Sequence, residues 1–260
     1  MVSELQAKTR VKWAYEPQDV AGKAVVITGG TTGIGRATAV LLGSRGARVL
    51  IFGRHDQELR DAMNDIKAVG GEVHGMAADV SRHEDVVRIF QHADHAIGGV
   101  EILINNAGIG SGSVVGTEYA DIRYAIETDL LAYLDCAHEA IERMKKKGEG
   151  HIVNIGSMSA QVADKGADIY VAAKMGVRGF CESLRKQLSE EHNIKVSLIE
   201  PGQVGADLSD KESSAEEAGK QDSLEMLKAE DIAECVLYCL TQPKRCDVVM
   251  VQVRPRRQPI

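Results

Sequence analysis

The chain has 260 residues, a usual length for one α/β domain whose sheet is covered by helices on both faces. A hydrophobic content of 44% and a charged content of 27% predict a globular protein and exclude a disordered or fibrous one. The net charge of −7 argues against nucleic-acid and membrane partners, because the basic runs, Lys145–Lys147 and the arginines of the tail, are short.

Short strand-like runs alternate with longer amphipathic stretches, which is typical of repeated βα units around a parallel sheet. The predicted strands are Ala24–Thr28, Arg48–Phe52, Glu72–Ala77, Ile102–Ile104, His151–Ile155, Lys195–Ile199 and Val248–Val251. The predicted helices are about Gly35–Ser44, Asp56–Val69, Arg82–Ile97, Tyr119–Lys147, Ile169–Glu191 and Ala229–Leu240. We therefore expect an α/β fold with a single-domain, Rossmann-type, doubly wound sheet of about seven parallel strands flanked by helices.

Two segments fall outside this alternation. Residues 1–19 precede the first strand and are expected to form an arm with little stability of its own, ahead of a dinucleotide-binding and catalytic domain at 20–260. At about 207–228 the composition turns to Asp, Glu, Ser, Lys and Ala, just after a strand end, where open α/β sheets bind ligands. This second segment is either a substrate lid or a merely solvated connection.

A glycine-rich segment directly follows the first predicted strand, and a helix follows it: Thr28-Gly29-Gly30-Thr31-Thr32-Gly33-Ile34-Gly35. Glycines let backbone N–H groups approach a pyrophosphate, whose charge the helix N-terminus then stabilises. Any tight turn between a strand and a helix can use glycines. The position between the first strand and first helix of a βαβ unit nevertheless favours dinucleotide binding.

The second predicted strand ends in Ile51-Phe52-Gly53-Arg54. No carboxylate stands there to hold the ribose 2′-hydroxyl of NAD. The guanidinium of Arg54 can instead pair with a 2′-phosphate through two hydrogen bonds, which favours NADP over NAD. The alternative is that Arg54 is an ordinary solvated arginine.

Three reactive side chains are predicted at the end of the fifth strand and on the helix that follows it. Tyr170 and Lys174 are four residues apart and therefore share one face of that helix. Ser157 closes the fifth strand, so its hydroxyl and the phenol can meet at the ligand-binding edge of the sheet. The Tyr/Lys spacing alone is common in helices. It indicates a catalytic site only because the pair follows the strand that Ser157 closes.

The cysteines and the hydropathy of the chain favour a cytoplasmic protein. Five cysteines form no CxxC pair, and an odd number leaves one unpaired in any all-disulfide scheme. Cys235 and Cys239, like His92 and His95, lack companion ligands at zinc-site spacing, so no metal is expected. There is no apolar run of membrane-spanning length, and residues 1–19 lack the apolar core of a signal peptide.

The motifs together point to one protein family. The glycine-rich segment, Asn105-Asn106-Ala107-Gly108, Ser157, the Tyr170/Lys174 pair and Pro201-Gly202 occur in the order and spacing of the short-chain dehydrogenases/reductases, which the chain resembles over roughly residues 20 to 253. Each motif alone is weak, since the asparagine–glycine segment also fits a plain turn after the fourth strand. Their combination is specific.

The resemblance implies a role for each catalytic residue. Tyr170 would donate a proton to the carbonyl oxygen during reduction, or remove it during oxidation. Lys174 would favour the phenolate by placing a cation beside it, and would bind the nicotinamide ribose. Ser157 would hydrogen-bond the reacting oxygen and fix its position.

The resemblance also implies which residues contact the cofactor. The expected set is Gly29, Thr31, Thr32, Gly33, Ile34, Gly35, Arg54, Asp79, Val80, Asn106, Ala107, Gly108, Tyr170, Lys174, Pro201, Gly202 and Val204. Asp79 and Val80 would lie beside the adenine. Pro201 and Gly202 would pass near the nicotinamide.

The chain departs from the family pattern at three places. Asp129 stands where relatives commonly carry an asparagine that helps a water chain reach the lysine. We include Asp129 in the catalytic set. Its carboxylate could pair with Lys174, but its negative charge would partly cancel the effect of that cation on Tyr170. The alternative is that Asp129 is a surface residue. Ala206 replaces a hydroxyl residue, and the tail at 251–255 resembles that of the subgroup acting on 3-hydroxy acids and related small alcohols.

The resulting hypothesis is an NADP-dependent oxidoreductase that transfers a hydride between nicotinamide and a carbonyl or secondary alcohol of a small organic substrate. The alternative is a catalytically impaired NADP-binding protein with a regulatory or assembly role, which only Asp129 favours. The resemblance also implies a homo-oligomer, a dimer or tetramer, through the helices Tyr119–Lys147 and Ile169–Glu191. The apolar positions of these helices could equally be covered by their own sheet.

Overall fold

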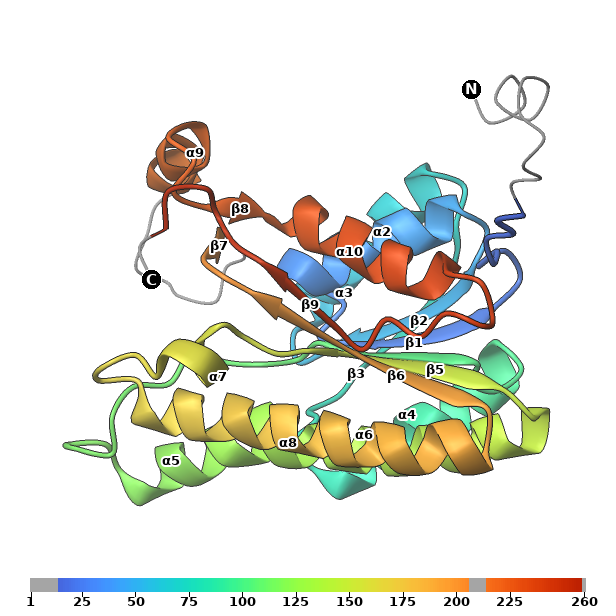
Figure 1. Cartoon of the computed structure of the whole chain (residues 1–260), viewed down its shortest axis with the longest axis horizontal. Coiled ribbons are helices and arrows are strands. Elements are labelled where there is room, and N and C mark those ends of the chain that lie inside the picture. Colours follow the sequence, from blue (N-terminus) through green and yellow to red (C-terminus); the bar gives the residue numbers. More distant parts are fainter. Residues whose placement is uncertain (1–13, 206–213, 259–260) are drawn as a thin grey trace.

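The computed structural model describes residues 14–205 and 214–258, which form three layers, a parallel sheet between two layers of helices (Figure 1). The sheet strands are β1 (Ala24–Thr28), β2 (Arg48–Gly53), β3 (Glu72–Ala77), β4 (Ile102–Asn105), β5 (Gly150–Ile155), β6 (Ile194–Pro201) and β9 (Met250–Val253). All seven pair in parallel, in the order β3-β2-β1-β4-β5-β6-β9. The predicted single-domain, doubly wound Rossmann-type fold is confirmed.

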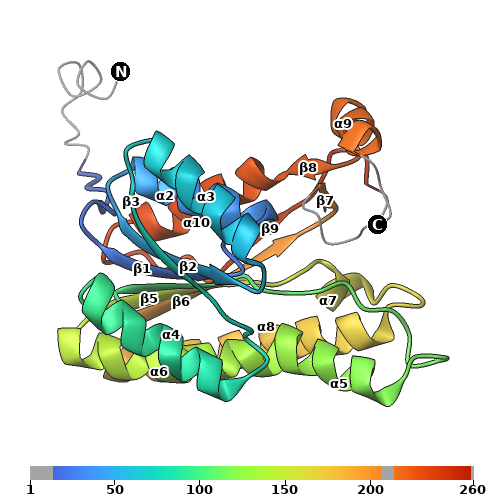
Figure 2. The same cartoon turned by 180° about the vertical axis from the view of Figure 1, so that it is seen from behind.

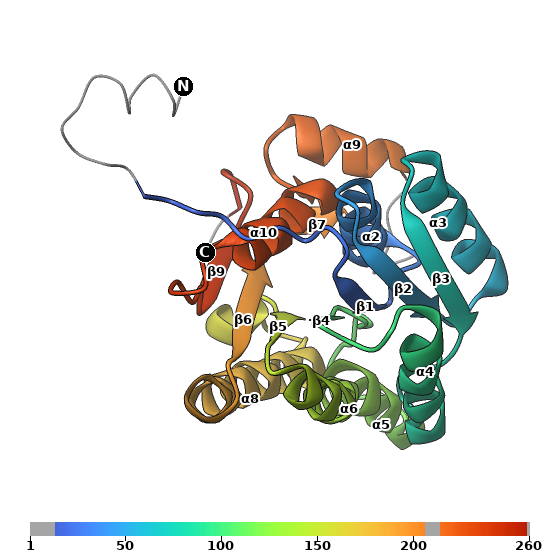
Figure 3. The ribbon, with the colours of Figure 1, turned by 90° about the vertical axis from the view of Figure 1, so that its right-hand side faces the viewer.

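The two helical layers cover opposite faces of the sheet, as the views from behind and from the side show (Figures 2 and 3). One layer holds α2 (Gly33–Ser44), α3 (Asp56–Ala68) and α10 (Ala229–Thr241). The other holds α4 (His83–Ala96), α5 (Tyr119–Ile126), η1 (Glu127–Leu131), α6 (Ala132–Lys147) and α8 (Asp168–Glu191). Because each face of the sheet is covered, the central strands are apolar on both sides, as continuous hydrophobic runs predict.

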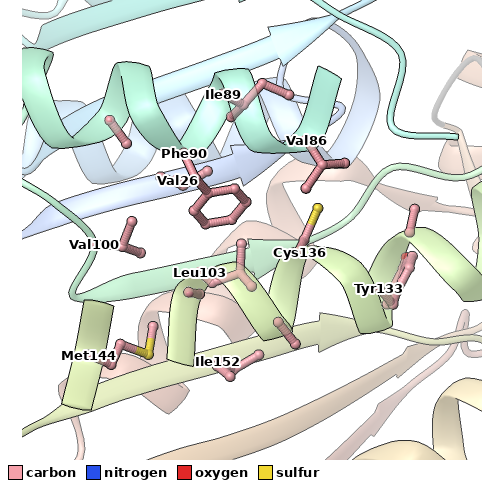
Figure 4. Packing of buried hydrophobic residues seen from close by; sticks show 14 of the residues in the cluster. Val26, Val86, Ile89, Phe90, Val100, Leu103, Tyr133, Cys136, Met144 and Ile152 are labelled. Atoms are coloured by element: carbon pink, nitrogen blue, oxygen red, sulfur yellow. The ribbon is translucent and has the colours of Figure 1, made fainter. Parts of the chain in front are cut away.

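Alternation along each strand divides the buried residues into two cores. Val26 of β1 and Leu103 of β4 pack with Phe90 of α4 and Cys136 of α6 (Figure 4). Val25, the neighbour of Val26, belongs to the other core, with side chains of α2 and α10. This packing fixes the register of the strands, because a shift by one residue would exchange the two faces.

The strand order reverses beside β1, which has β2 on one side and β4 on the other. The loops that leave β1 and β4 therefore turn to opposite faces of the sheet and open a crevice at its carboxyl edge. Open α/β sheets bind their ligands at this kind of position.

The predicted helix Tyr119–Lys147 is continuous but contains one π-helical turn, η1, between α5 and α6. The other predicted helices agree to within two residues at each end, and β9 begins and ends two residues later than predicted. Four short elements were not predicted: α7 (Ser159–Val162), β7 (Val204–Gly205), α9 (Ser214–Asp222) and β8 (Leu227–Lys228). β7 and β8 pair with each other, outside the main sheet.

Parts of the predicted arm and lid lie outside the described residues, namely 1–13 and 207–213, as does Ala206. Within the arm, the Gln18 N–H donates to the carbonyl of Thr241 at 2.8 Å. Within the lid segment, α9 and β8 are formed. Among the described residues, no helix combines the length and the apolar character needed to cross a membrane.

Candidate active site

A cavity of about 210 Å³ lies at the carboxyl ends of β1, β4, β5 and β6. Every residue predicted to contact the cofactor lines it, except Gly35: Gly29, Thr31, Thr32, Gly33, Ile34, Arg54, Asp79, Val80, Asn106, Ala107, Gly108, Tyr170, Lys174, Pro201, Gly202 and Val204. Ser157 lines it as well. The topology thus brings together segments that are far apart in the sequence, as the motifs predicted.

The glycine-rich segment makes close backbone contacts that exclude larger residues. Gly29 has a φ of +61°, and a Cβ there would lie 2.9 Å from the Cα of Ala107. A Cβ on Gly35 would overlap the carbonyl oxygen of Gly29, so Gly35 is needed for this turn although it does not line the cavity. The hydroxyl of Thr28 joins the two loops, because it accepts hydrogen bonds from the N–H groups of Asn106 and Ala107 at 2.8 and 2.7 Å.

The start of α2 has the properties of an anion site. Thr32 is the N-cap residue and makes no side-chain capping hydrogen bond. The first N–H groups of the helix lack partners within the helix, and Thr32, Gly33 and Ile34 all line the cavity. The positive end of the helix dipole therefore faces the space in which a phosphate would lie.

Arg54 lies exposed at the mouth of the cavity, directly after β2. Its Nη1 donates to the hydroxyl of Tyr124 at 2.6 Å, and that hydroxyl donates to Oδ2 of Asp79 at 3.3 Å. Burial, together with the nearby Asp79, raises the pKa of Tyr124. Tyr124 was not predicted as a site residue, since it comes from α5, whose sequence contains no motif that points to the cavity.

Three of the four predicted catalytic residues, Ser157, Tyr170 and Lys174, line the same cavity, whereas Asp129 is not among its lining residues. Lys174 is buried, with 3% of its surface exposed, and its Nζ lies 5.5 Å from the centroid of the Tyr170 ring. Ser157 follows β5, and its Oγ accepts a hydrogen bond from the N–H of Ser159 at 3.1 Å. A cation, a phenol and a hydroxyl are therefore arranged around one space, which suits proton transfer to or from an oxygen atom.

Tyr133 is a buried partner of Lys174 that the sequence analysis missed. Lys174 Nζ donates to the Tyr133 hydroxyl at 3.3 Å, and this hydroxyl donates to the carbonyl of Ile155 at 2.9 Å. Burial raises the pKa of Tyr133 to about 12. Burial also acts to lower the pKa of Lys174, but Tyr133, Tyr170 and Asp129 outweigh it and raise that pKa above its ordinary value. The i, i+4 spacing of Tyr133 from Asp129 was the available signal.

Asp129 is completely buried in the π-helical turn, which makes the alternative of a surface residue wrong. Its Oδ1 accepts a hydrogen bond from the N–H of Ile109 at 2.7 Å, whereas its Oδ2 has no partner among the described residues. A Cβ on Gly108 would lie 3.2 Å from Asp129 Oδ1 and 3.5 Å from Lys174 Nζ, so both groups face this glycine. Burial raises the pKa of Asp129 to about 6, although Lys174 acts in the opposite direction.

Metal ligation receives no support from the part of the chain that the structure describes, where no three His, Cys, Asp or Glu side chains come together to hold an ion. The residues around the main cavity are suited instead to an organic dinucleotide. Glycines and a helix N-terminus line this cavity together with a phenol and an ammonium.

Comparison with known proteins agrees with this geometry. A family model described as short chain dehydrogenase matches residues 23–217. An uncharacterized oxidoreductase of Staphylococcus aureus (strain USA300) is 32% identical over 234 residues, which cover 90% of this chain and 97% of the relative. A farnesol dehydrogenase of Aedes aegypti is 32% identical over 242 residues, which cover 90% of this chain and 96% of the relative.

Solved structures give the same result. A variant of actinorhodin polyketide ketoreductase with NADPH has a TM-score of 0.81 and 27% identity, covering 90% of this chain and 96% of that one. A metagenomic short-chain oxidoreductase in complex with NADP has a TM-score of 0.78 and 30% identity, covering 92% and 99%. Motifs, sheet order, cavity and relatives agree, and the chain belongs to the short-chain dehydrogenase/reductase family of oxidoreductases.

Proposed function

We propose that this oxidoreductase is NADP-dependent and transfers a hydride between nicotinamide and a carbonyl or secondary alcohol of a small organic substrate, such as a 3-oxo or 3-hydroxy acid. One observation carries the proposal. A single cavity is lined both by the glycine-rich segment with the start of α2 and by Ser157, Tyr170 and Lys174. A dinucleotide bound along this cavity would have its phosphates at the first group and its nicotinamide at the second.

The chain's own residues supply binding and proton transfer. The bound nicotinamide provides or accepts the hydride, and the protein must then manage the charge on the reacting oxygen. Tyr170 is the proposed proton donor and acceptor, and Lys174, held by Tyr133 and the carbonyl of Ile155, keeps a positive charge near it. Ser157 is proposed to donate a hydrogen bond to the reacting oxygen and to hold it next to the phenol.

Arg54 supports the choice of NADP. It is the cation at the cavity mouth, next to Asp79 and Val80, where the adenine ribose would lie. No acidic residue occupies positions 51–54, at which a carboxylate would favour the 2′-hydroxyl of NAD. Two similar structures are described with NADP or NADPH, and the name of the mosquito relative indicates an alcohol substrate.

Oligomerisation and location in the cytoplasm remain predictions. Leu131, Leu134 and Met175, on η1, α6 and α8, are 53%, 38% and 43% exposed. A contact between two copies through these helices would remove this apolar surface from water. The five free thiols suit a reducing compartment.

The experiment that tests the proposal compares the protein with its Tyr170→Phe variant. Each is incubated with NADPH and a panel of aldehydes, ketones and 3-oxo acids, and oxidation of NADPH is followed by absorbance. We expect turnover by the unaltered protein and a loss of roughly 10²- to 10⁴-fold in kcat for the variant, since the proton donor is removed. NADPH affinity, measured by fluorescence titration, should stay close to that of the unaltered protein.

Tyr238→Phe is the matched control, because Tyr238 lies on α10, is 54% exposed and does not line the cavity. It should retain full turnover. NADPH binding without oxidation of any panel member would favour the catalytically impaired alternative. Near-normal turnover by Tyr170→Phe would refute the role given to this phenol.

A further inference from the structure

A second cavity, of about 270 Å³, adjoins the first. The two share Ser157, Pro201 and Gly202. Because Ser157 carries the hydroxyl assigned to the reacting oxygen, this second space is accessible to the rest of a substrate that reaches Ser157. The remaining walls come from Met158 and α7 with the residues after it, from Gln203 after β6, and from the segment that follows β9.

The segment after β9 is held against the loop that follows β6. The Gly202 N–H donates to the carbonyl of Val253 at 2.7 Å, and the Gln203 N–H donates to Oε1 of Gln258 at 2.9 Å. The Arg257 N–H donates to the carbonyl of Leu224 at 3.0 Å. A Cβ on Gly202 would lie 3.0 Å from the Cβ of Arg254, so the two backbones pass in close contact. Residues 254–258 therefore form a fixed wall of the cavity.

Arg254 brings a positive charge to this wall. Within the described part of the chain its guanidinium forms no ion pair, and its one hydrogen bond is a long one, from Nη1 to the carbonyl of Gln258 at 3.5 Å. Several other arginines of the chain, including Arg143 and Arg178, are paired with carboxylates. Arg254 thus has donors available to a ligand in the cavity.

Asp164 is the acidic side chain among the residues that line the same cavity. It follows α7, which belongs to the α8 side of the sheet, whereas the segment after β9 runs toward α9 (Figure 1). Its Oδ2 already accepts a hydrogen bond from the Ser159 hydroxyl at 2.7 Å. An anion would consequently bind on the Arg254 side, away from this carboxylate.

We propose that Arg254 binds a carboxylate of the substrate and so selects oxo acids and hydroxy acids over neutral carbonyl compounds and alcohols. A guanidinium is planar and can donate two parallel hydrogen bonds to a carboxylate, which fixes orientation as well as charge. The reacting carbon then lies between this anchor and Ser157. This inference rests on the proposed function of the site.

The test uses two substrates that share a reacting ketone but differ in charge, acetoacetate and methyl acetoacetate. We expect Arg254→Gln to raise the ratio of their KM values, acid over ester, by roughly tenfold, the lower end of what a hydrogen bond to a charged group provides. Arg254→Lys, which retains the charge but not the planar fork, should show a smaller rise. The KM of the acid should also increase with ionic strength in the unaltered protein.

Arg256→Gln is the control, since Arg256 is an exposed arginine two residues away that does not line the cavity. It should leave the KM ratio unchanged. Equal changes in the KM of acid and ester on Arg254→Gln, or turnover of the ester without the acid by the unaltered protein, would overturn the inference and leave the proposed function intact. Failure of the unaltered protein to oxidise NADPH with any carbonyl compound would instead refute the proposed function.

Discussion

The guanidinium of Arg54 lies at the cavity mouth and donates to Tyr124 and not to a carboxylate. A 2′-phosphate would compete for these donors, and the hydroxyl of Tyr124 could remain as a second partner. We expect Arg54→Gln to weaken NADPH binding by about tenfold or more and to change NADH binding little, because only the former carries the phosphate. Fluorescence titration with both nucleotides measures the two affinities.

Tyr124→Phe serves as the control for Arg54. It removes the hydroxyl that holds the arginine but keeps the charge, so preference for NADPH should persist. An equal loss of NADPH and NADH affinity on Arg54→Gln would mean that the arginine does not recognise the 2′-phosphate.

Asp129 makes the stability of this protein depend on pH. Burial raises its pKa from the ordinary value of 3.8 to about 6, so the folded protein binds a proton more tightly than the unfolded chain does. Stability contributed by the protonated carboxyl is present below pH 4 and is lost as the pH rises to about 6. Relative to the unaltered protein, Asp129→Asn should therefore gain on the order of 2–3 kcal/mol in unfolding free energy between pH 4 and pH 7.

Urea denaturation at a series of pH values measures this difference. His151 also titrates abnormally, since burial lowers its pKa to about 3, but both proteins contain it and its contribution cancels. Asp121→Asn, an exposed substitution on α5, controls for the loss of one negative charge. A difference between Asp129→Asn and the unaltered protein that stays constant from pH 4 to pH 7 would contradict the prediction.

At the scale of elements, the hydrophobic pattern of the sequence predicted strand and helix boundaries, but not the irregularity that tertiary contacts impose on a helix. β1 and β3 were predicted to the residue. For β1 the reason is a fully buried run bounded by turns, which leaves little freedom in where the strand ends. The helix at 119–147 was predicted as regular, yet it contains the π-helical turn at Glu127–Leu131. A tertiary hydrogen bond from Ile109 to Asp129 holds this turn, and Leu130 packs closely on Gly176 of α8. Neither contact can be predicted from the helical periodicity of the sequence.

The candidate site likewise contains residues that local sequence patterns predict and residues that only tertiary contacts bring together. Tyr170 and Lys174 could be predicted because one helix turn separates them, and Ser157 because strand ends in a parallel sheet share one edge. Tyr124 could not, since it reaches Arg54 across the fold and belongs to no motif. Tyr133, which contacts Lys174 across the fold, was indicated only by its spacing from Asp129. Arg254 could not be predicted either, because only the folding of the chain after β9 brings it into the same cavity as Ser157.

At the scale of the whole molecule, the two edges of the sheet carry different groups. The carboxyl edge holds both cavities described above. At the amino edge, Lys23 Nζ pairs with Glu101 at 2.9 Å and with Glu149 at 3.0 Å, and Lys244 pairs with Glu149 at 2.7 Å. These pairs join the residues directly before β1, β4 and β5 with the turn after α10. The groups proposed for function therefore lie at the opposite edge of the sheet from these ion pairs.

Glu149 allows this separation to be tested, because it directly precedes β5, whose other end leads to Ser157. Hydrogen bonds from Lys244 and Lys23 lower its pKa from 4.5 to about 2, so its contribution is complete above pH 4.5 and is lost as the pH falls toward 2. The side chain is 36% exposed, and solvent screening limits the contribution to less than about 1 kcal/mol.

At pH 7 and low salt we expect Glu149→Gln to lower the Tm by a few degrees at most, with kcat unchanged. Glu142→Gln, on the surface of α6, should leave both unchanged. Thermal denaturation at low and high ionic strength distinguishes the cause: a Tm difference that persists in 1 M salt would mean that packing, and not charge, accounts for the effect.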